Sequence, residues 1–174
     1  VGPEGPVTRA GARIGDVLSV TGPLGGSRAG RHLRFTPRLA EARALAARGV
    51  PHARMDHSDG LSRDRPRHSR AAGVGAVVEA EARPVHPDVA DGSLDAALHD
   101  GEDFELLLAH APLDAAARDA LREAGVVLHP IGFVVDADRG VTLRAGGGDR
   151  PLVPAGYDHL LVRDGDDEAP AEER

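Results

Sequence analysis

The stretch "DFELLLAHAPLDAAARDALREAGVVLHPIGFVV" spans residues 103–135 and predicts a strand, a helix and a second strand. Residues 103–110 form a short apolar run of the length expected for a buried strand. Residues 113–125 carry apolar side chains on one helical face and charges on the other, as an amphipathic helix does. Residues 126–135 return to an apolar run. This succession indicates a sheet with helices packed on it.

The same alternation continues through the rest of the chain, so the fold class is α/β or α+β. Pro66 lies inside one predicted helix and is expected to kink or shorten it. Arg65 and His68, three residues apart, share the face of that helix that should be buried. Further strands are predicted at 16–22, 51–58, 74–82 and 140–146, further helices at 38–49, 60–73 and 94–101, a weak short helix at 24–33 and a hairpin loop at 145–150.

The chain of 174 residues has the length of one domain. We expect that domain to cover residues 1–162 and the acidic stretch 163–174 to be a disordered tail. No apolar run approaches the roughly 18 residues that a membrane helix needs. The first residues also lack the pattern of a secretion signal, so a cytoplasmic location is the default expectation.

Composition excludes several kinds of chemistry. The chain has no cysteine, which excludes disulfides, thiolate zinc sites and a cysteine nucleophile. It also has no lysine, which excludes a Walker-type phosphate loop and a Schiff-base enzyme. The net charge of −7 is the opposite of the basic face that nucleic-acid binding requires.

The segment "RMDHSDGLSRD" at 54–64 places two acids around a serine at the end of a predicted strand. The carboxylates of Asp56 and Asp59 suit Mg²⁺, and Ser58 offers a hydroxyl to a phosphate. Backbone N–H groups at the start of the following helix can face an anion. The alternative is that Ser58 or Asp59 simply caps that helix, and these residues taken alone favour the cap.

A second acidic cluster, in "HDGEDFELLL" at 99–108, precedes another predicted strand. Two like charges about 4 Å apart repel by roughly 4 kcal/mol near a protein surface, so acids at 100, 102 and 103 need a cation or hydrogen-bond donors nearby. Arg9 lies in a glycine-rich stretch, where its guanidinium can clamp a phosphate or simply be solvated. The two acidic clusters together predict a magnesium–phosphate site.

Seven segments, taken in order, resemble the C-terminal domain of the thiamine-monophosphate kinase family. That family belongs to an ATP-binding superfamily that includes aminoimidazole ribonucleotide synthetase, selenophosphate synthetase and a hydrogenase maturation factor. The segments are "VTRAGARIGDVLSVTGPLGGS" (7–27), "PRLAEARALAARG" (37–49), "DHSDGL" (56–61), "AGVGA" (72–76), "GEDFELL" (101–107), "IGFV" (131–134) and "GYDHL" (156–160).

The resemblance implies a mixed β-sheet covered by helices, with part of an ATP and Mg²⁺ site. The family transfers the γ-phosphoryl group of ATP to thiamine monophosphate, giving thiamine diphosphate. Mapped onto this sequence, the family's roles are Mg²⁺ ligands at Asp56 and Asp59, ATP contacts at Arg9 and Ser58, and substrate contacts at Glu102 and Tyr157. No catalytic nucleophile is expected, since phosphoryl transfer depends on positioning and charge neutralisation.

The sequence departs from the family in three respects, one of which is that His57 replaces the usual apolar residue between Asp56 and Ser58. The family has an N-terminal domain that supplies further Mg²⁺-binding aspartates and the main homodimer contact, and that domain is absent from this sequence. The family also makes the helix at 60–73 apolar and unbroken. We therefore expect a kinase C-terminal domain that is inactive without its N-terminal partner. The alternatives are another synthetase of the superfamily, or a stand-alone binding module with a relic site.

Overall fold

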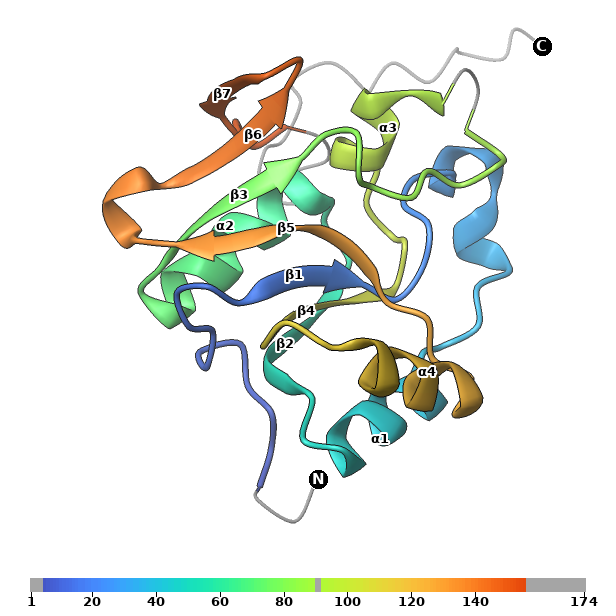
Figure 1. The fold of residues 1–174 in the computed structure, drawn as a ribbon. Helices are drawn as coiled ribbons and strands as arrows, with labels where there is room; N and C mark the ends of the chain where they lie inside the picture. The colour runs from blue at the N-terminus through green and yellow to red at the C-terminus, as the bar shows by residue number, and fades with distance from the viewer. Residues whose placement is uncertain (1–4, 90–91, 156–174) are drawn as a thin grey trace, which may run out of the picture.

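One mixed sheet of seven strands organises the computed structural model, which describes residues 5–89 and 92–155. The strands lie in the order β2-β4-β1-β5-β3-β6-β7 (Figure 1). Every neighbouring pair is antiparallel except β3 and β6, which are parallel. The strands are β1 (Val17–Val20), β2 (Pro51–His57), β3 (Gly75–Glu79), β4 (Glu105–His110), β5 (His129–Val135), β6 (Val141–Ala145) and β7 (Gly148–Pro151).

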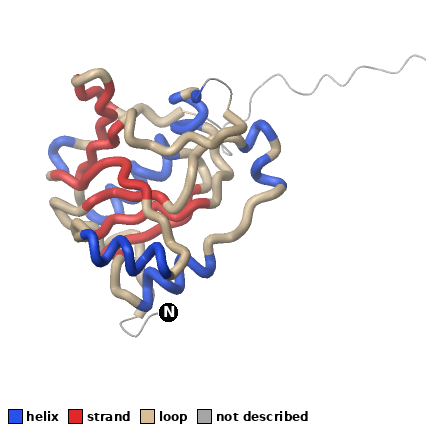
Figure 2. Tube along the Cα trace, turned by 45° about the vertical axis from the view of Figure 1, so that its right-hand side comes forward, coloured by secondary structure: helices blue, strands red, loops and turns tan. Residues whose placement is uncertain are grey.

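Helices lie on both sides of the sheet, as Figure 2 shows. They are α1 (Leu39–Ala47), α2 (Leu61–Ala72), α3 (Leu94–His99) and α4 (Ala115–Glu123), with 3-10 turns η1 (Ser27–Ala29), η2 (Arg31–Leu33) and η4 (Ala137–Arg139). The predicted α+β class and the mixed, helix-covered sheet are confirmed. In the part of the chain that the structure describes, no helix is long and apolar enough to cross a membrane.

Strand β4 is buried on both faces, which explains its unbroken apolar run. Leu107 packs into the larger core on one face of the sheet. Leu108, the next residue, points to the other face and packs with Leu45 of α1 and Leu121 of α4. Burying one leucine side chain contributes roughly 1.5–3 kcal/mol, so this strand anchors helices on both sides.

The prediction that Pro66 shortens its helix is wrong. Helix α2 runs continuously through Pro66 and ends at Gly73, whose left-handed conformation closes the last turn. Pro66 removes only the hydrogen bond that a residue-66 N–H would give to the Ser62 carbonyl. The turn before it is held by the Gly60 carbonyl, which accepts from the N–H groups of Arg63 and Asp64.

The buried face of α2 does carry Arg65 and His68, as the spacing predicted. Both side chains are 0% exposed. The two contact each other through Arg65 Nη1 and His68 Nδ1. Arg65 Nε and Nη2 and His68 Nε2 are buried without a hydrogen-bond partner among the described residues. A buried polar group without a partner costs about 1–3 kcal/mol, so this helix face is destabilising.

His68 makes the fold sensitive to mild acid. Burial and the neighbouring Arg65 charge lower its pKa from 6.5 to about 3. Between these values the unfolded chain binds a proton that the folded chain does not, so stability falls as the pH decreases. We expect the wild type to lose about 2 kcal/mol more than His68→Leu between pH 7 and pH 5, measured by urea unfolding. Equal losses in the two proteins would contradict this expectation.

Candidate functional site

Two segments far apart in the sequence meet where β2 ends and β4 begins. The Glu102 N–H donates to the Ser58 carbonyl at 2.6 Å, and the Phe104 N–H donates to the His57 carbonyl at 2.9 Å. Gly101 permits this approach, because a Cβ at that position would lie 2.5 Å from the Ser58 carbonyl oxygen. The Ser-Asp-Gly turn and the Gly-Glu-Asp segment therefore form one structural unit.

The backbone of the Gly-Glu-Asp segment is strained. Glu102 and Phe104 have φ angles of 60° and 53°, and they are the non-glycine residues with positive φ in the described chain. Such conformations cost of order 1–3 kcal/mol each and cluster at binding sites. Here they leave Glu102 exposed while Asp103 is buried.

A hollow of about 390 Å³ opens beside this unit. It brings together three residues that the sequence predicted as ligand contacts, namely Ser58, Asp59 and Glu102. Its other lining residues are Ser27, Arg28, His99, Asp100 and Gly101. We call it the site hollow.

Arginines and carboxylates meet around the site hollow. Asp59 pairs with Arg67 of α2. The Arg28 Nε atom lies 3.2 Å from Asp100 Oδ1, with the Arg28 side chain 86% exposed and Asp100 only 9% exposed. Because the Arg28 side chain is exposed, its guanidinium can also pair with an anionic ligand in the hollow.

Sequence reasoning did not assign Arg28 or His99 to the site, and it counted Asp100 among the clustered acids without giving it a role. The acidic "HDGED" segment was a signal for Asp100, since carboxylates cluster there. The glycine-rich "GGSRAG" segment was a weaker signal for Arg28. His99 carried no signal, because only the packing of α3 against α2 brings it to the hollow, where its Nδ1 lies 2.8 Å from Ser62 Oγ.

A buried carboxylate supports the floor of the site hollow. Asp64 Oδ2 accepts hydrogen bonds from the N–H groups of Ser58 at 2.9 Å and Asp59 at 3.0 Å. The same oxygen lies 3.0 Å from His57 Nδ1. His57 Nε2 in turn lies 3.6 Å from Asp103 Oδ2. The backbone of the Ser-Asp-Gly turn is thus fixed by Asp64, and His57 Nε2 and Asp103 Oδ2 face each other without a hydrogen bond.

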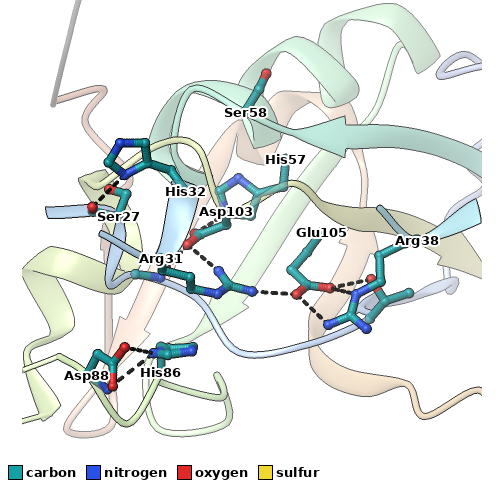
Figure 3. Close-up of polar contacts among 12 residues, drawn as sticks. Ser27, Arg31, His32, Arg38, His57, Ser58, His86, Asp88, Asp103 and Glu105 are labelled. Atoms are coloured by element: carbon teal, nitrogen blue, oxygen red, sulfur yellow. Dashed lines mark hydrogen bonds and ion pairs between the residues drawn. The ribbon is translucent and has the colours of Figure 1, made fainter. Parts of the chain in front are cut away.

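The row of charges continues away from the site hollow (Figure 3). Asp103 Oδ1 accepts from Arg31 Nη1 at 2.7 Å and from the Gly25 N–H at 2.8 Å. Arg31 Nη2 donates to Glu105 Oε1 at 2.6 Å, and Arg38 binds both Glu105 oxygens. Ser58 points away from this row in Figure 3. The row therefore supports the Gly-Glu-Asp segment through Asp103, and Arg31, Arg38, Asp103 and Glu105 line a separate hollow of about 340 Å³.

The two acids of this row shift in opposite directions. Burial raises the pKa of Asp103, against the pull of the His57 and Arg31 charges. Burial also acts to raise the pKa of Glu105, but hydrogen bonds from Arg38 and Thr21 outweigh it and the pKa is lowered. The pKa of Arg38 is raised by the same hydrogen bond to Glu105. Glu105 is therefore held as a carboxylate by its partners.

The structure separates Asp56 from Asp59. Successive strand residues point to opposite faces, so Asp56 faces away from the buried His57. Asp56 lines a different hollow, together with Val7 and Phe104. The structure therefore does not bring Asp56 into the site hollow with Ser58 and Asp59.

Arg9 also lies outside the site hollow. It is exposed, and the preceding residue Thr8 accepts a hydrogen bond from the Arg54 N–H at the outer edge of β2. Tyr157 and the predicted tail at 163–174 lie outside the described residues. Within 5–89 and 92–155, no three His, Asp or Glu side chains are grouped so as to hold a metal ion.

This fold, with its acidic turns at two adjoining strand ends, is that of a known domain class. Residues 13–144 match the family described as AIR synthase related protein, C-terminal domain. The chain belongs to this family.

Several similar curated proteins share one name. The chain is 42% identical to the thiamine-monophosphate kinase of Rhodopirellula baltica, over 76% of this chain and 44% of that protein. It is 34% identical to the thiamine-monophosphate kinase of Salmonella typhimurium, over 88% of this chain and 55% of that protein. The predicted resemblance is confirmed, and the chain spans about half the length of these relatives.

Solved structures agree with this assignment. The thiamine monophosphate kinase of Aquifex aeolicus matches with a TM-score of 0.68 and 27% identity, over 83% of this chain and 54% of that one. A structure of AaThiL complexed with AMPPCP and TMP matches with a TM-score of 0.62 and 26% identity, over 82% of this chain and 51% of that one. Hydrogenase maturation protein HypE from E. coli, at 24% identity, shares the fold with a TM-score of 0.69, over 89% of this chain and 54% of that one.

Proposed function

We propose that this chain is the C-terminal part of an ATP-dependent thiamine-phosphate kinase, which phosphorylates thiamine monophosphate to thiamine diphosphate. The observation that carries the proposal is the site hollow. It collects Ser58, Asp59 and Glu102, which the family resemblance assigns to nucleotide, metal and substrate respectively. The similar kinases, one of them solved with AMPPCP and TMP, support the same reaction.

The residues of the site hollow suit phosphoryl transfer, which depends on positioning and charge neutralisation. The Ser58 hydroxyl can hydrogen-bond a nucleotide phosphate, and the fixed turn beneath it keeps that hydroxyl in place. Arg28, which is exposed beside Asp100, can pair with a phosphate oxygen. Glu102 can accept a hydrogen bond from the thiamine part of the substrate.

Mg²⁺ fits this donor set when it arrives with a nucleotide. The ion usually takes one or two protein carboxylates and completes its shell with water and phosphate oxygens. Asp59 and Asp100 line the same hollow and would supply those carboxylates, and the bound ion would neutralise phosphate charge. Asp59 would then exchange its pair with Arg67 for the ion.

The roles proposed for Asp56, Arg9 and Tyr157 apply to the two-domain enzyme with its ligands bound. Asp56 as a second Mg²⁺ ligand and Arg9 as a nucleotide contact require a ligand that reaches the β2 edge. Tyr157 is assigned to the thiamine substrate. The family's N-terminal domain would add further Mg²⁺-binding aspartates and the homodimer contact, so we expect the isolated chain to be inactive.

The proposal is tested in a two-domain kinase. We would join this chain to the N-terminal part of the Rhodopirellula baltica kinase and measure thiamine diphosphate formation. Asp59→Asn is expected to lower kcat/KM about 100-fold, since it removes charge stabilisation at the transferred phosphate. Asp119→Asn, an exposed aspartate of α4, is the matched control and should leave turnover unchanged. Full turnover in Asp59→Asn would contradict the assignment.

A further inference from the structure

A second cavity, of about 240 Å³, lies where α4 packs against the sheet. No residue lines both this cavity and the site hollow. We call it the α4 cavity. Its lining residues are Val17, Ser19, His110, Pro112, Leu113, Arg118, Leu121, Arg122, Val126, Val127, Leu128 and Pro130.

The floor of the α4 cavity holds a buried polar pair. Ser19 is 0% and His110 3% exposed, and Ser19 Oγ lies 2.9 Å from His110 Nε2. His110 Nδ1 lies 2.8 Å from the Ala111 carbonyl oxygen, which only accepts hydrogen bonds. Nδ1 therefore carries the ring proton, and Nε2 accepts the Ser19 hydroxyl proton. Ser19 Oγ has lone pairs left over, and because Ser19 is 0% exposed, a ligand donor reaches them only when the cavity wall shifts slightly.

Burial lowers the pKa of His110, which agrees with a neutral ring at this position. The floor therefore carries no charge. Its fixed hydrogen-bond acceptor is Ser19 Oγ. The Ser19 hydroxyl and the His110 ring already hydrogen-bond each other. A bound water needs two to four polar partners, so an apolar body suits this space better than solvent does.

The rim of the α4 cavity is positive. Arg118 and Arg122 are exposed side chains on consecutive turns of α4, and no carboxylate lines the cavity. Arg118 Nη1 donates to the Leu113 carbonyl at 2.6 Å, and Arg122 Nη1 pairs with the exposed Asp119 at 3.0 Å. A guanidinium has five N–H donors, so both arginines keep donors for an anion at the rim.

We propose that the α4 cavity binds a small carboxylate with a compact hydrocarbon body, whose inner end carries a hydroxyl or N–H donor. The carboxylate pairs with Arg118 and Arg122, the hydrocarbon contacts the apolar walls, and the inner group donates to Ser19 Oγ. An apolar cavity of about 150 Å³ holds benzene, so a cavity of 240 Å³ accommodates a substituted six-membered ring.

Three related probes test this proposal on the 174-residue chain, with binding followed by NMR chemical shifts. They are 4-hydroxybenzoate, benzoate and 4-hydroxybenzamide. We expect 4-hydroxybenzoate to bind best, and benzoate about three- to tenfold more weakly, as the loss of one hydrogen bond predicts. Ser19→Ala should abolish that preference for the hydroxyl. The double variant Arg118→Gln/Arg122→Gln should abolish the preference for the carboxylate over the amide.

A substitution at the exposed rim of the α4 cavity tests where the probe binds without changing a buried residue. Val127 lines the cavity and is 51% exposed, so Val127→Trp should block the entrance without disturbing the core. Val153, which is 67% exposed and does not line the cavity, provides the matched variant Val153→Trp. Saturable binding that Val127→Trp removes and Val153→Trp keeps supports the proposal.

Two outcomes would overturn it. One is the absence of saturable shifts with any probe at millimolar concentration. The other is binding that Val127→Trp leaves unchanged, which places the probe elsewhere. The experiment uses no nucleotide, metal or thiamine compound. The α4 cavity and the kinase proposal can therefore fail separately.

Discussion

Replacing Arg65 with methionine should stabilise the folded chain by about 2–4 kcal/mol. The guanidinium is fully buried, its Nε and Nη2 atoms have no hydrogen-bond partner among the described residues, and its Nη1 faces His68 rather than an acid. Burial lowers the Arg65 pKa to about 9, so the side chain is still charged at pH 7. Methionine is unbranched and fills the same narrow space without a charge.

Urea unfolding at pH 7 measures this gain. The matched control is Arg70→Met, at an exposed position of the same helix, which should change the free energy of unfolding by less than about 0.5 kcal/mol. A loss of stability in Arg65→Met would show that the guanidinium has an acceptor worth more than its burial costs.

The fold was predictable in outline because the apolar patterns of its strongest elements follow directly from how each element is buried. The apolar run of β4 and the amphipathic pattern of α4 depend on burial alone, and both elements form as expected. Residues 145–150 were predicted as a hairpin loop because of their glycines, whereas the structure forms strand β7 at Gly148–Pro151, with every residue exposed. This strand forms through backbone hydrogen bonds to β6, and the pattern of its side chains gives no sign of that pairing.

The site was predictable only in part. Ser58, Asp59 and Glu102 meet because both segments follow or precede strands that are neighbours in the sheet. Asp56 was grouped with them because it is close in sequence. Strand β2 ends at His57, so Asp56 is still inside the strand and lines a different hollow, whereas Ser58 and Asp59 lie in the turn beyond the strand.

The supporting row of charges was not predictable from the sequence. Its members come from six places in the chain. These are turn η2 (Arg31), the start of α1 (Arg38), the end of β2 (His57), α2 (Asp64), the residue two before β4 (Asp103) and the first residue of β4 (Glu105). The spacing of these residues along the sequence does not indicate that they meet in the fold. Only the sheet order brings β2 and β4 together and sets His57 opposite Glu105.

Glu105→Gln should destabilise the fold by about 3–5 kcal/mol, the cost of removing one partner from a buried ionic group. Glu105 is 1% exposed. Its Oε1 accepts from Arg31 and Arg38, and its Oε2 accepts from Arg38 and Thr21. A glutamine would turn an N–H₂ group toward one of these donors and leave an arginine charge buried without its counter-ion.

The control for Glu105→Gln is Glu41→Gln, because Glu41 also pairs with Arg38, at 3.0 Å, but is 18% exposed at the start of α1. We expect this control to lose less than about 1 kcal/mol, as partly solvated pairs do. The pKa of Glu105 is lowered from 4.5, so its contribution is complete above that pH and is lost as the pH falls through the folded-state value. The difference between wild type and Glu105→Gln should therefore shrink when urea unfolding is repeated below pH 4.5. If Glu105→Gln and Glu41→Gln lost equal amounts of unfolding free energy at pH 7, solvent rather than Glu105 would be stabilising the arginine charges.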